Sequence, residues 1–376
     1  MAVYRILSPS MFPSLLRIPI VPAMPRLLML LAFFVLLLVA VLGVLVRATK
    51  RSMFGLAGAT TVLGALLIGR VDVRQSVTIQ LSAFGTCLCL AIALSCWLLL
   101  RTGSNSPAPP AMVAIRICYV LLGGLLGARI GYWLLIDGVS TSWRDIINFR
   151  SGGLFGFGAY LGGLLASLCT IRRDQRAFAG WLDHLALPLL LAIGITRIGC
   201  YLEGCDFGRP LRPGAHPLLA ALGTFPRWPQ SPSDHYLGSP AWINHVSHWG
   251  LSPDATASLP VHPVQLYEAA FTFGLLLVGL AYRKRQRPAG VLFLYTVMAY
   301  GFGYFLLGFL RGDLTRSVVL ISNRLHWTIP FGSHEQWAAL CACALSLLVC
   351  RSWRHEQAFW TQFRPLFRAA KARFSP

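Results

Sequence analysis

The sequence is short of charge, and acidic residues are the scarcest. Charged types make up 12% of the 376 residues, with 13 Asp and Glu against 33 Lys and Arg. An average soluble domain has about 25% charged residues, so this shortage excludes a disordered chain and an ordinary soluble enzyme. Hydrophobic types reach 56%, and several uncharged runs attain the roughly 20 residues that cross a bilayer as a helix. The net charge of +20 therefore indicates cytoplasmic loops and anionic lipid headgroups, with no nucleic acid partner.

A disulfide framework and metal-binding spacings are also missing. Eight of the ten cysteines lie in apolar runs, where Cys behaves as a small hydrophobe, and only Cys200 and Cys205 flank a polar turn. His245 and His248 have an HxxH spacing without a third ligand at a fixed distance, so we expect no metal and no cofactor. The glycine-rich GFGAYLGG (156–163) follows no strand, which favours helix packing over a phosphate loop.

The hydrophobic runs predict an all-α, polytopic bundle of about nine transmembrane helices. The candidate spans are 27–46, 54–70, 78–100, 112–136, 152–171, 179–201, 264–282, 289–310 and 334–350. The second is short and rich in glycine. If it does not cross, only the segment before it changes sides.

The distribution of Lys and Arg predicts the orientation. Basic residues gather in alternate loops and in the tail 351–376, which we place in the cytoplasm as a basic amphipathic segment on the membrane surface. The long segment 204–262 is then periplasmic. Its tryptophans suggest packing or a seat at the membrane interface. Residues 1–77 form an N-terminal extension with one or two spans, and 78–350 form the main membrane domain.

Charges within or at the ends of spans predict the site. Arg129 and Arg197 lie in spans, Glu268 lies just inside the seventh, and Arg311 and Asp313 close the eighth. Each alone could snorkel or pin two helices together. Their clustering toward the external half favours a shared anion site, because a guanidinium offers a planar fork of donors suited to phosphate.

Five motifs occur in an order that resembles one family. They are GGLLGARIGYW, GGLFGFGAYLGG, TRIGCYLEGCDFGRP, VHPVQLYEA and GYFLLGFLRGD. Together they resemble the phosphatidylglycerol:prolipoprotein diacylglyceryl transferases, bacterial inner-membrane enzymes with seven spans. The resemblance covers about residues 78–350, and Gln336-Trp337 extends it into the last span.

The resemblance implies a reaction and a set of residues. A diacylglyceryl group would move from phosphatidylglycerol to the lipobox cysteine of a preprolipoprotein, forming a thioether in the plane of the bilayer. The implied catalytic residues are Arg197, Glu268 and Glu203. Those implied for substrate binding are Arg129, Arg209, Gly199, Gly204, Gly208, His262, Gln265, Tyr267 and Arg311.

The chain departs from the family's pattern at several polar positions. Phe157 stands where a His is usual, and Tyr304 and Gly308 stand where an Arg and a Glu are usual. Cys200, Glu203 and Cys205 replace two Asn and a Glu. An alternative hypothesis is therefore a diverged paralogue that binds phospholipid or lipoprotein precursors without transfer. A transporter is disfavoured, because the hydropathy shows no inverted repeat.

Overall fold

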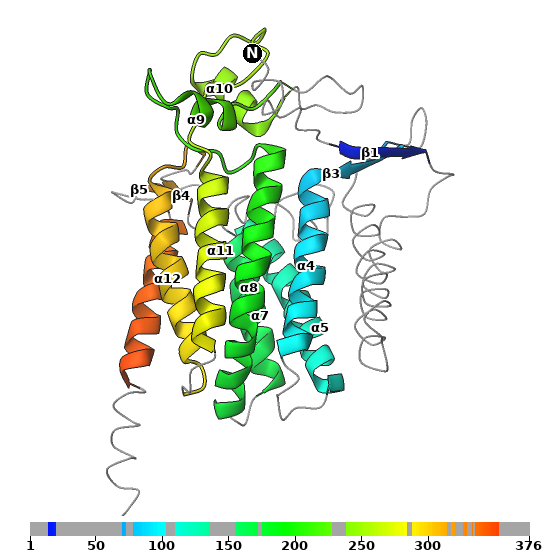
Figure 1. Cartoon of the computed structure of the whole chain (residues 1–376), viewed down its shortest axis with the longest axis vertical. Coiled ribbons are helices and arrows are strands. Elements are labelled where there is room, and N and C mark those ends of the chain that lie inside the picture. Colours follow the sequence, from blue (N-terminus) through cyan, green and yellow to red (C-terminus); the bar gives the residue numbers. More distant parts are fainter. Residues whose placement is uncertain are drawn as a thin grey trace, which may run out of the picture.

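The structure is a computed structural model that describes a helical bundle and parts of its loops. The described residues are 14–19, 70–72, 78–102, 110–134, 155–171, 175–227, 238–283, 288–313, 317–319, 326–328, 333 and 335–352. The helices are α4 (Ala83–Thr102), α5 (Pro110–Tyr132), α7 (Gly156–Thr170), α8 (Gln175–Glu203), α9 (Pro217–Leu222), α10 (Pro240–His248), α11 (Val264–Arg283), α12 (Val291–Gly308) and residues 335–352. Figure 1 shows the long helices side by side.

The helices coincide with the expected spans from the third onward. Five of those described, α4, α5, α8, α11 and α12, are long and apolar enough to cross a membrane, and α7 is a shorter apolar helix. The chain is thus a polytopic helical membrane protein. The expected spans 27–46 and 54–70 lie outside the described residues, apart from Arg70 at the start of a strand.

The structure adds five short strands to the expected helical bundle. Residues 78–82 were expected to begin a span, yet they form β3 (Thr78–Ser82), which pairs antiparallel with β1 (Ser14–Pro19) and β2 (Arg70–Asp72). A second pair joins β4 (Ser317–Val319) to β5 (His326–Thr328). The alternation in Thr-Ile-Gln-Leu-Ser suits a strand, but an apolar run that continues into α4 conceals it.

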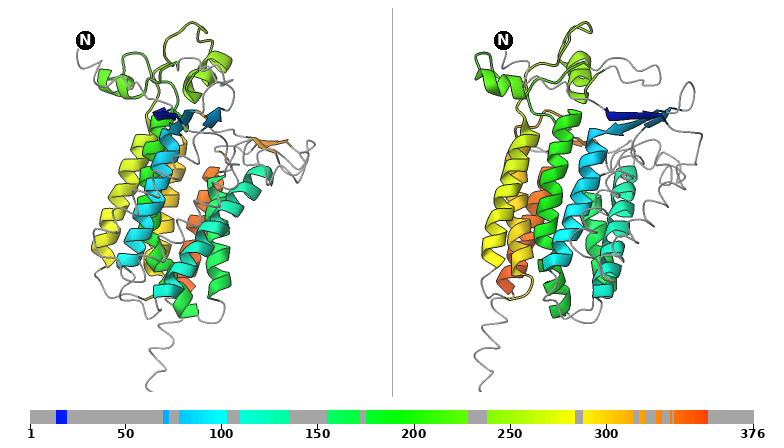
Figure 2. Two further views of the ribbon diagram at one scale, coloured as in Figure 1. Left: turned by 90° about the vertical axis from the view of Figure 1, so that its right-hand side faces the viewer. Right: turned by 45° about the vertical axis from the view of Figure 1, so that its right-hand side comes forward.

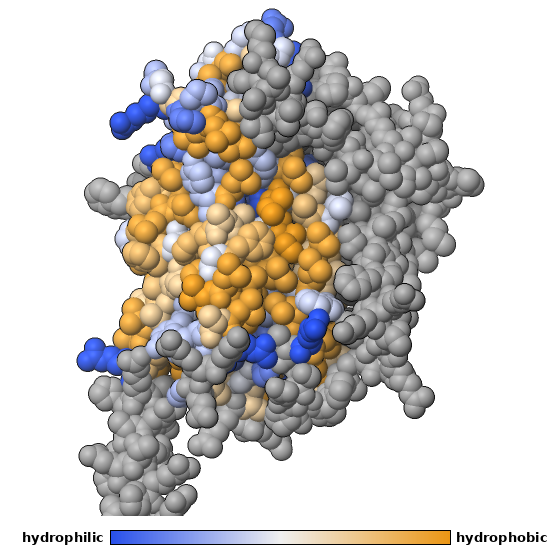
Figure 3. Space-filling model, viewed as in Figure 1, coloured by the Kyte–Doolittle hydropathy of each residue, from blue (hydrophilic) through white to orange (hydrophobic). Residues whose placement is uncertain are grey.

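The bundle is organised around α8. This helix packs against α4 on one side and α11 on the other, while α11 packs against α12, and α5 pairs with α7. The two views of Figure 2 show α5 and α7 standing together beside the other helices. Leu187 and Leu190 of α8 meet Leu276 of α11 and Leu292 of α12 in one buried cluster. A band of hydrophobic surface between two polar ends is visible in Figure 3, as a bilayer requires.

Asp183 of α8 fixes the start of α12. Its carboxylate oxygens accept hydrogen bonds of 2.8 Å from the backbone N–H groups of Gly290 and Phe293. A carboxylate at a helix N-terminus satisfies free N–H groups and complements the helix dipole. This contact holds α12, which carries part of the site at its other end, in position against α8.

Glycines allow α5 and α7 to touch through their backbones. A Cβ atom built on Gly158 or Gly162 of α7 would collide with the carbonyl oxygen of Gly127 or Gly123 of α5. The prediction that 156–163 packs helices is confirmed. Small residues give this close approach where lipid supplies no hydrophobic drive between helices.

We expect Gly162→Ala to destabilise the protein. Its methyl group has no space against the α5 backbone, and overpacking typically costs about 1–3 kcal/mol. Thermal unfolding of the detergent-solubilised protein measures the effect. Gly274→Ala on α11 is the matched control, since a Cβ there meets nothing within 4 Å. Equal unfolding temperatures for the two variants would contradict the tight contact.

The described parts of 204–262 form a folded cap at one end of the bundle (Figure 1). Phe207, Phe225, Ala241 and Val261 make a small buried core, and the Trp242 indole N–H donates to the Ala255 carbonyl at 2.8 Å. The expected packing of aromatic residues is confirmed at Trp242, while Trp249 is exposed. Trp228 and Tyr236 lie outside the described residues. The cap is thus anchored by packed aromatic side chains directly above the helix ends.

Candidate active site

Arg197, in the last two turns of α8, is held by two carboxylates. Its Nε lies 2.9 Å from Oε1 of Glu268 in α11, and its Nη1 donates to Asp206. The Glu268 side chain is only 2% exposed, and the same Oε1 accepts a 2.6 Å hydrogen bond from the Tyr300 hydroxyl of α12. Three helices therefore fix one guanidinium. Because the Tyr300 hydroxyl holds the same Oε1 atom that contacts Arg197, the Glu268 carboxylate is fixed in place and in turn orients Arg197.

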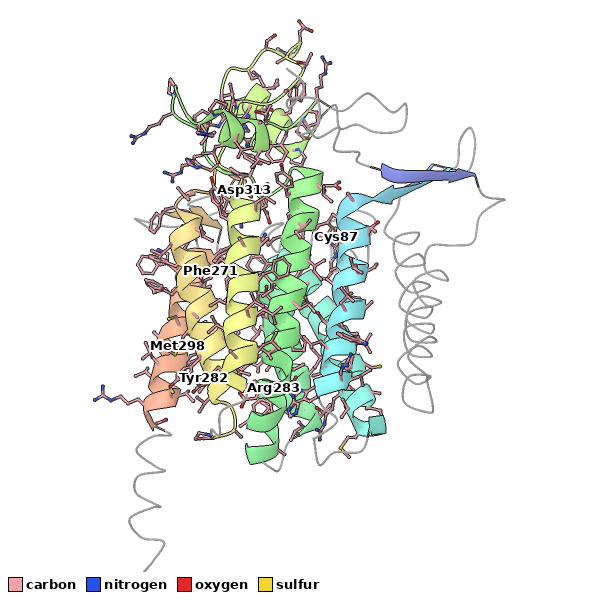
Figure 4. The ribbon with its side chains drawn as sticks, viewed as in Figure 1. Cys87, Phe271, Tyr282, Arg283, Met298 and Asp313 are labelled. Carbon is pink, nitrogen blue, oxygen red and sulfur yellow. The ribbon has the colours of Figure 1, made fainter. Side chains whose placement is uncertain are left out.

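Asp206 joins Arg197 to a second arginine. Its Oδ1 lies 2.9 Å from Nη2 of Arg311, which also forms a two-pronged contact with Asp313 at 3.0 and 2.7 Å. Burial would raise the pKa of Asp206, but Arg311 and Arg197 outweigh it and hold that pKa well below its usual range. The carboxylate is therefore ionised at neutral pH between two cations, of which Arg311 is buried and Arg197 partly buried. Figure 4 places Asp313 at the end of the bundle beneath the cap.

The backbone around Asp206 makes this arrangement possible. Gly204 has φ +74° and Asp206 itself has φ +55°, so the chain leaves α8 and turns sharply back. The N–H of Gly208 donates to the His262 carbonyl at 3.1 Å, and the N–H of Arg209 donates to the Leu310 carbonyl at 2.7 Å. These bonds tie the ends of α8, α11 and α12 into one unit.

Several sequence-predicted residues meet at this unit. The side chain of Arg209 donates from Nε to the Arg311 carbonyl at 3.3 Å, and Gln265 donates from Nε2 to the Cys205 carbonyl at 2.6 Å. The amide Oε1 of Gln265 is buried and has no hydrogen-bond partner among the described residues. A buried acceptor without a partner, beside the turn that carries Asp206, is a position for a ligand donor such as a hydroxyl.

For the other residues predicted from the sequence, the described contacts are with groups other than Arg197, Asp206 and Arg311. Arg129 is 1% exposed, and its guanidinium lies over the Tyr132 ring at 5.7 Å. A Cβ on Gly199 would meet Cys87 of α4 at 2.8 Å, so this glycine serves helix packing. Tyr267 packs against the His262 ring, and Glu203 is half-buried at the end of α8.

The sequence prediction missed Tyr300, Tyr304 and Glu335 as members of the site. The Tyr304 hydroxyl donates to Glu335 at 2.5 Å and accepts from Arg311 at 3.2 Å, and Glu335 itself lies 3.9 Å from Arg311. The spacing of four residues between the two tyrosines, which places both on one face of α12, was an available signal. Glu335 gave none, because it lies outside the apolar pattern of its helix.

At two positions where the chain differs from the family's usual residues, Gly308 and Phe157, other side chains fill the space. A Cβ on Gly308 would meet Gln336 Cγ at 2.6 Å, so the amide of Gln336 occupies the space beside α12 and Glu335 reaches Tyr304 next to it. The Phe157 ring packs edge-on against Tyr304, with centroids 5.8 Å apart. Two packed aromatic rings therefore occupy the place where the resemblance implied a histidine side chain.

The sulfur and histidine groups offer no built metal site in the described part of the chain. Cys200, Cys205 and Asp206 have ligand atoms within 4.8 Å of one another. The Asp206 carboxylate is taken by two arginines, whose positive charges oppose a cation. His245 instead accepts the Leu259 N–H at 3.1 Å through Nδ1, so it is a structural residue of the cap.

Comparison with known proteins identifies the family of the chain. The profile of the prolipoprotein diacylglyceryl transferase family matches residues 72–350. The phosphatidylglycerol–prolipoprotein diacylglyceryl transferase of Symbiobacterium thermophilum is 29% identical over 254 residues, covering 66% of this chain and 81% of its own. The second such enzyme of Clostridium perfringens is 25% identical over 263 residues, covering 68% and 88%. That of Clostridium tetani is 25% identical over 203 residues, covering 54% and 70%. The chain therefore belongs to the prolipoprotein diacylglyceryl transferase family.

Proposed function

We propose that this chain transfers the diacylglyceryl group of phosphatidylglycerol to the lipobox cysteine of preprolipoproteins, at the site formed by Arg197, Asp206 and Arg311. The observation that carries the proposal is two guanidinium groups joined by one carboxylate at the ends of α8 and α12. Family membership and the apolar helices make the chain a multi-pass protein of the bacterial inner membrane. Both substrates, a lipid and a lipoprotein precursor, are available to it there.

Arg197 is the residue that we propose to hold the lipid phosphate. Its described contacts use Nε and Nη1, whereas a guanidinium has five N–H donors, so we propose Nη2 as the donor to a phosphate oxygen. Gln265 Oε1 is the acceptor suited to a hydroxyl of the glycerol headgroup. We propose that Arg209, at the surface of the same unit, and Arg129 guide the anionic headgroup.

The chemistry then needs a thiolate and a stabilised leaving group. The cysteine sulfur attacks the carbon of the diacylglyceryl group that is bonded to the phosphate oxygen. The bond between this carbon and that oxygen breaks, and glycerol phosphate leaves with both bonding electrons. The negative charge on the leaving oxygens grows beside Arg197, which is fixed in advance by Glu268 and Asp206 and so needs no rearrangement. The attacking thiol, with an ordinary pKa of about 8.5, must first lose its proton.

The carboxylates divide this work. Glu268 is buried and engaged with Arg197 and Tyr300, which supports a role in orienting Arg197. Glu203 lies at the end of α8 and is half-buried, which suits a proton acceptor for the thiol. Glu335, on the neighbouring helix, supplies a carboxylate beside Arg311 where Gly308 has none. This replacement supports an active transferase over a paralogue that only binds.

We expect purified protein, given phosphatidylglycerol and a lipobox peptide, to add a diacylglyceryl mass to the peptide. Mass spectrometry is the readout. Glu268→Gln should slow this reaction about tenfold, because glutamine retains an acceptor for Arg197 but loses one charge-assisted contact. Glu203→Gln should slow it less. If the wild-type protein binds the lipid but adds no mass to the peptide, the transferase hypothesis is rejected in favour of a paralogue that only binds.

We also propose that the cap 204–262 is periplasmic and the tail 351–376 cytoplasmic. The cap lies at one end of the bundle, whereas the last described helix, 335–352, ends away from it (Figure 1), as α11 does at Arg283 (Figure 4). Residues 1–77 are then an addition that brings the number of spans to about nine, and the tail lies on the inner membrane surface.

A labelling experiment tests this orientation. In a background lacking native cysteines, Ser252→Cys in the exposed part of the cap should react with an impermeant thiol reagent in intact spheroplasts. Ser352→Cys, exposed at the end of the last described helix, should react only after lysis. The reverse pattern would place the active site on the cytoplasmic side.

A further inference from the structure

Two cysteines lie in the turn that carries Asp206. Cys200 is buried in the last turn of α8, and Cys205 follows Gly204, where the chain reverses. Their sulfur atoms are within 4.8 Å of each other. The N–H of Cys205 donates to the Cys200 carbonyl at 3.1 Å, and its thiol lies 3.7 Å from the same oxygen. The backbone hydrogen bond thus holds the two cysteines next to each other in the turn.

We propose that Cys200 and Cys205 are a modification site at which a reversible disulfide closes the Asp206 turn. In the structure both are free thiols. To form the bond, the two sulfur atoms must close from within 4.8 Å to about 2.05 Å. The cross-link is electrically neutral, so it adds no charge beside Arg197, whereas a metal cation in the same place would meet two guanidinium groups.

The reaction is a thiol–disulfide exchange with a small disulfide as the oxidant. One cysteine thiolate attacks the oxidant and forms a mixed disulfide, and the other cysteine then displaces the second oxidant thiol. Two protein thiols become one disulfide, and one oxidant disulfide becomes two thiols. The bond would hold the left-handed backbone conformation of Asp206, which residues other than glycine rarely adopt. In the cell this step rests on the periplasmic placement proposed above, because disulfides persist in that compartment.

Purified full-length protein in detergent tests the proposal without reference to membrane orientation. Samples are incubated with glutathione disulfide or with a phosphine reductant, free thiols are alkylated, and peptides are mapped by mass spectrometry. We expect one Cys200–Cys205 bond in the oxidised sample, and thermal unfolding about 2–4 °C higher than in the reduced sample. Cys205→Ser should abolish both effects, while Cys341→Ser, an exposed cysteine on the last helix, should keep both.

Three results would overturn the proposal. One is alkylation of both thiols after oxidation, and another is a bond from Cys200 to Cys87, which approaches the same turn from α4. The third is protection of both thiols by added Zn²⁺ alone, which would make the pair metal ligands. Transfer activity is measured on the same samples. If both thiols stay free after oxidation while the peptide is still modified, the cross-link is refuted and the proposed function stands. If the disulfide forms but neither the oxidised nor the reduced sample modifies the peptide, the proposed function is refuted and the cross-link stands.

Discussion

Replacing Arg197 by alanine is expected to lower diacylglyceryl transfer by about 10²–10³-fold, the loss typical when one preorganised donor to a developing negative charge is removed. Arg311 cannot take its place, because Asp206, Asp313 and Tyr304 already engage it. The lipobox peptide assay with purified protein measures the loss. Because the effect is on the leaving group, the rate at saturating lipid should fall.

Arg197→Lys is the informative companion variant. Lysine keeps the positive charge for Glu268 and Asp206 but lacks the planar fork of donors, so we expect only partial recovery. Size-exclusion chromatography and thermal unfolding of both variants establish that the bundle is intact, since alanine leaves Glu268 buried without its partner. Near-normal turnover in a folded Arg197→Ala protein would show that Arg197 merely pins α8 to α11.

Asp206→Asn is expected to lower transfer about 10–100-fold. Asparagine has the same shape, yet it removes the negative charge that holds Arg197 and Arg311 together, and hydrogen bonds to charged groups contribute about 1.5–3 kcal/mol. The two guanidinium groups then repel each other, and Arg197 is no longer fixed for the phosphate. Asp254→Asn, on the exposed surface of the cap, is the matched control and should leave the rate unchanged.

The same carboxylate gives a pH signature. The pKa of Asp206 is depressed in the folded protein, so its stabilising contribution is complete above its unfolded pKa of about 4 and is lost as pH falls toward the folded value. Asp206→Asn should therefore flatten the dependence of unfolding temperature on pH below about 4. Identical pH profiles for wild type and variant would show that Asp206 carries no net ionic stabilisation in the turn.

Local sequence determined the membrane helices and part of the site. Runs of about 20 apolar residues can satisfy their backbone hydrogen bonds in lipid only as helices, so seven expected spans coincide with described helices. Charges are costly in such runs, and that cost singled out Arg197 and Glu268 together with Arg129, Arg311 and Asp313. The period-two alternation of residues 78–82 was masked by the apolar run that follows, so the start of the first described span was misplaced.

Only the tertiary structure decided which charges meet. Asp206 reaches Arg311, 105 residues later, because two left-handed residues turn the chain back over the end of α8 and backbone bonds dock it on α12. Glu335 reaches Tyr304 because Gly308 leaves room for the helix that follows. The apolar pattern of a segment indicates only whether lipid or water surrounds it. Because every membrane helix is surrounded by lipid, this pattern cannot show which helices contact one another. The partners of a buried charge depend instead on helix packing and loop geometry, which no local pattern records.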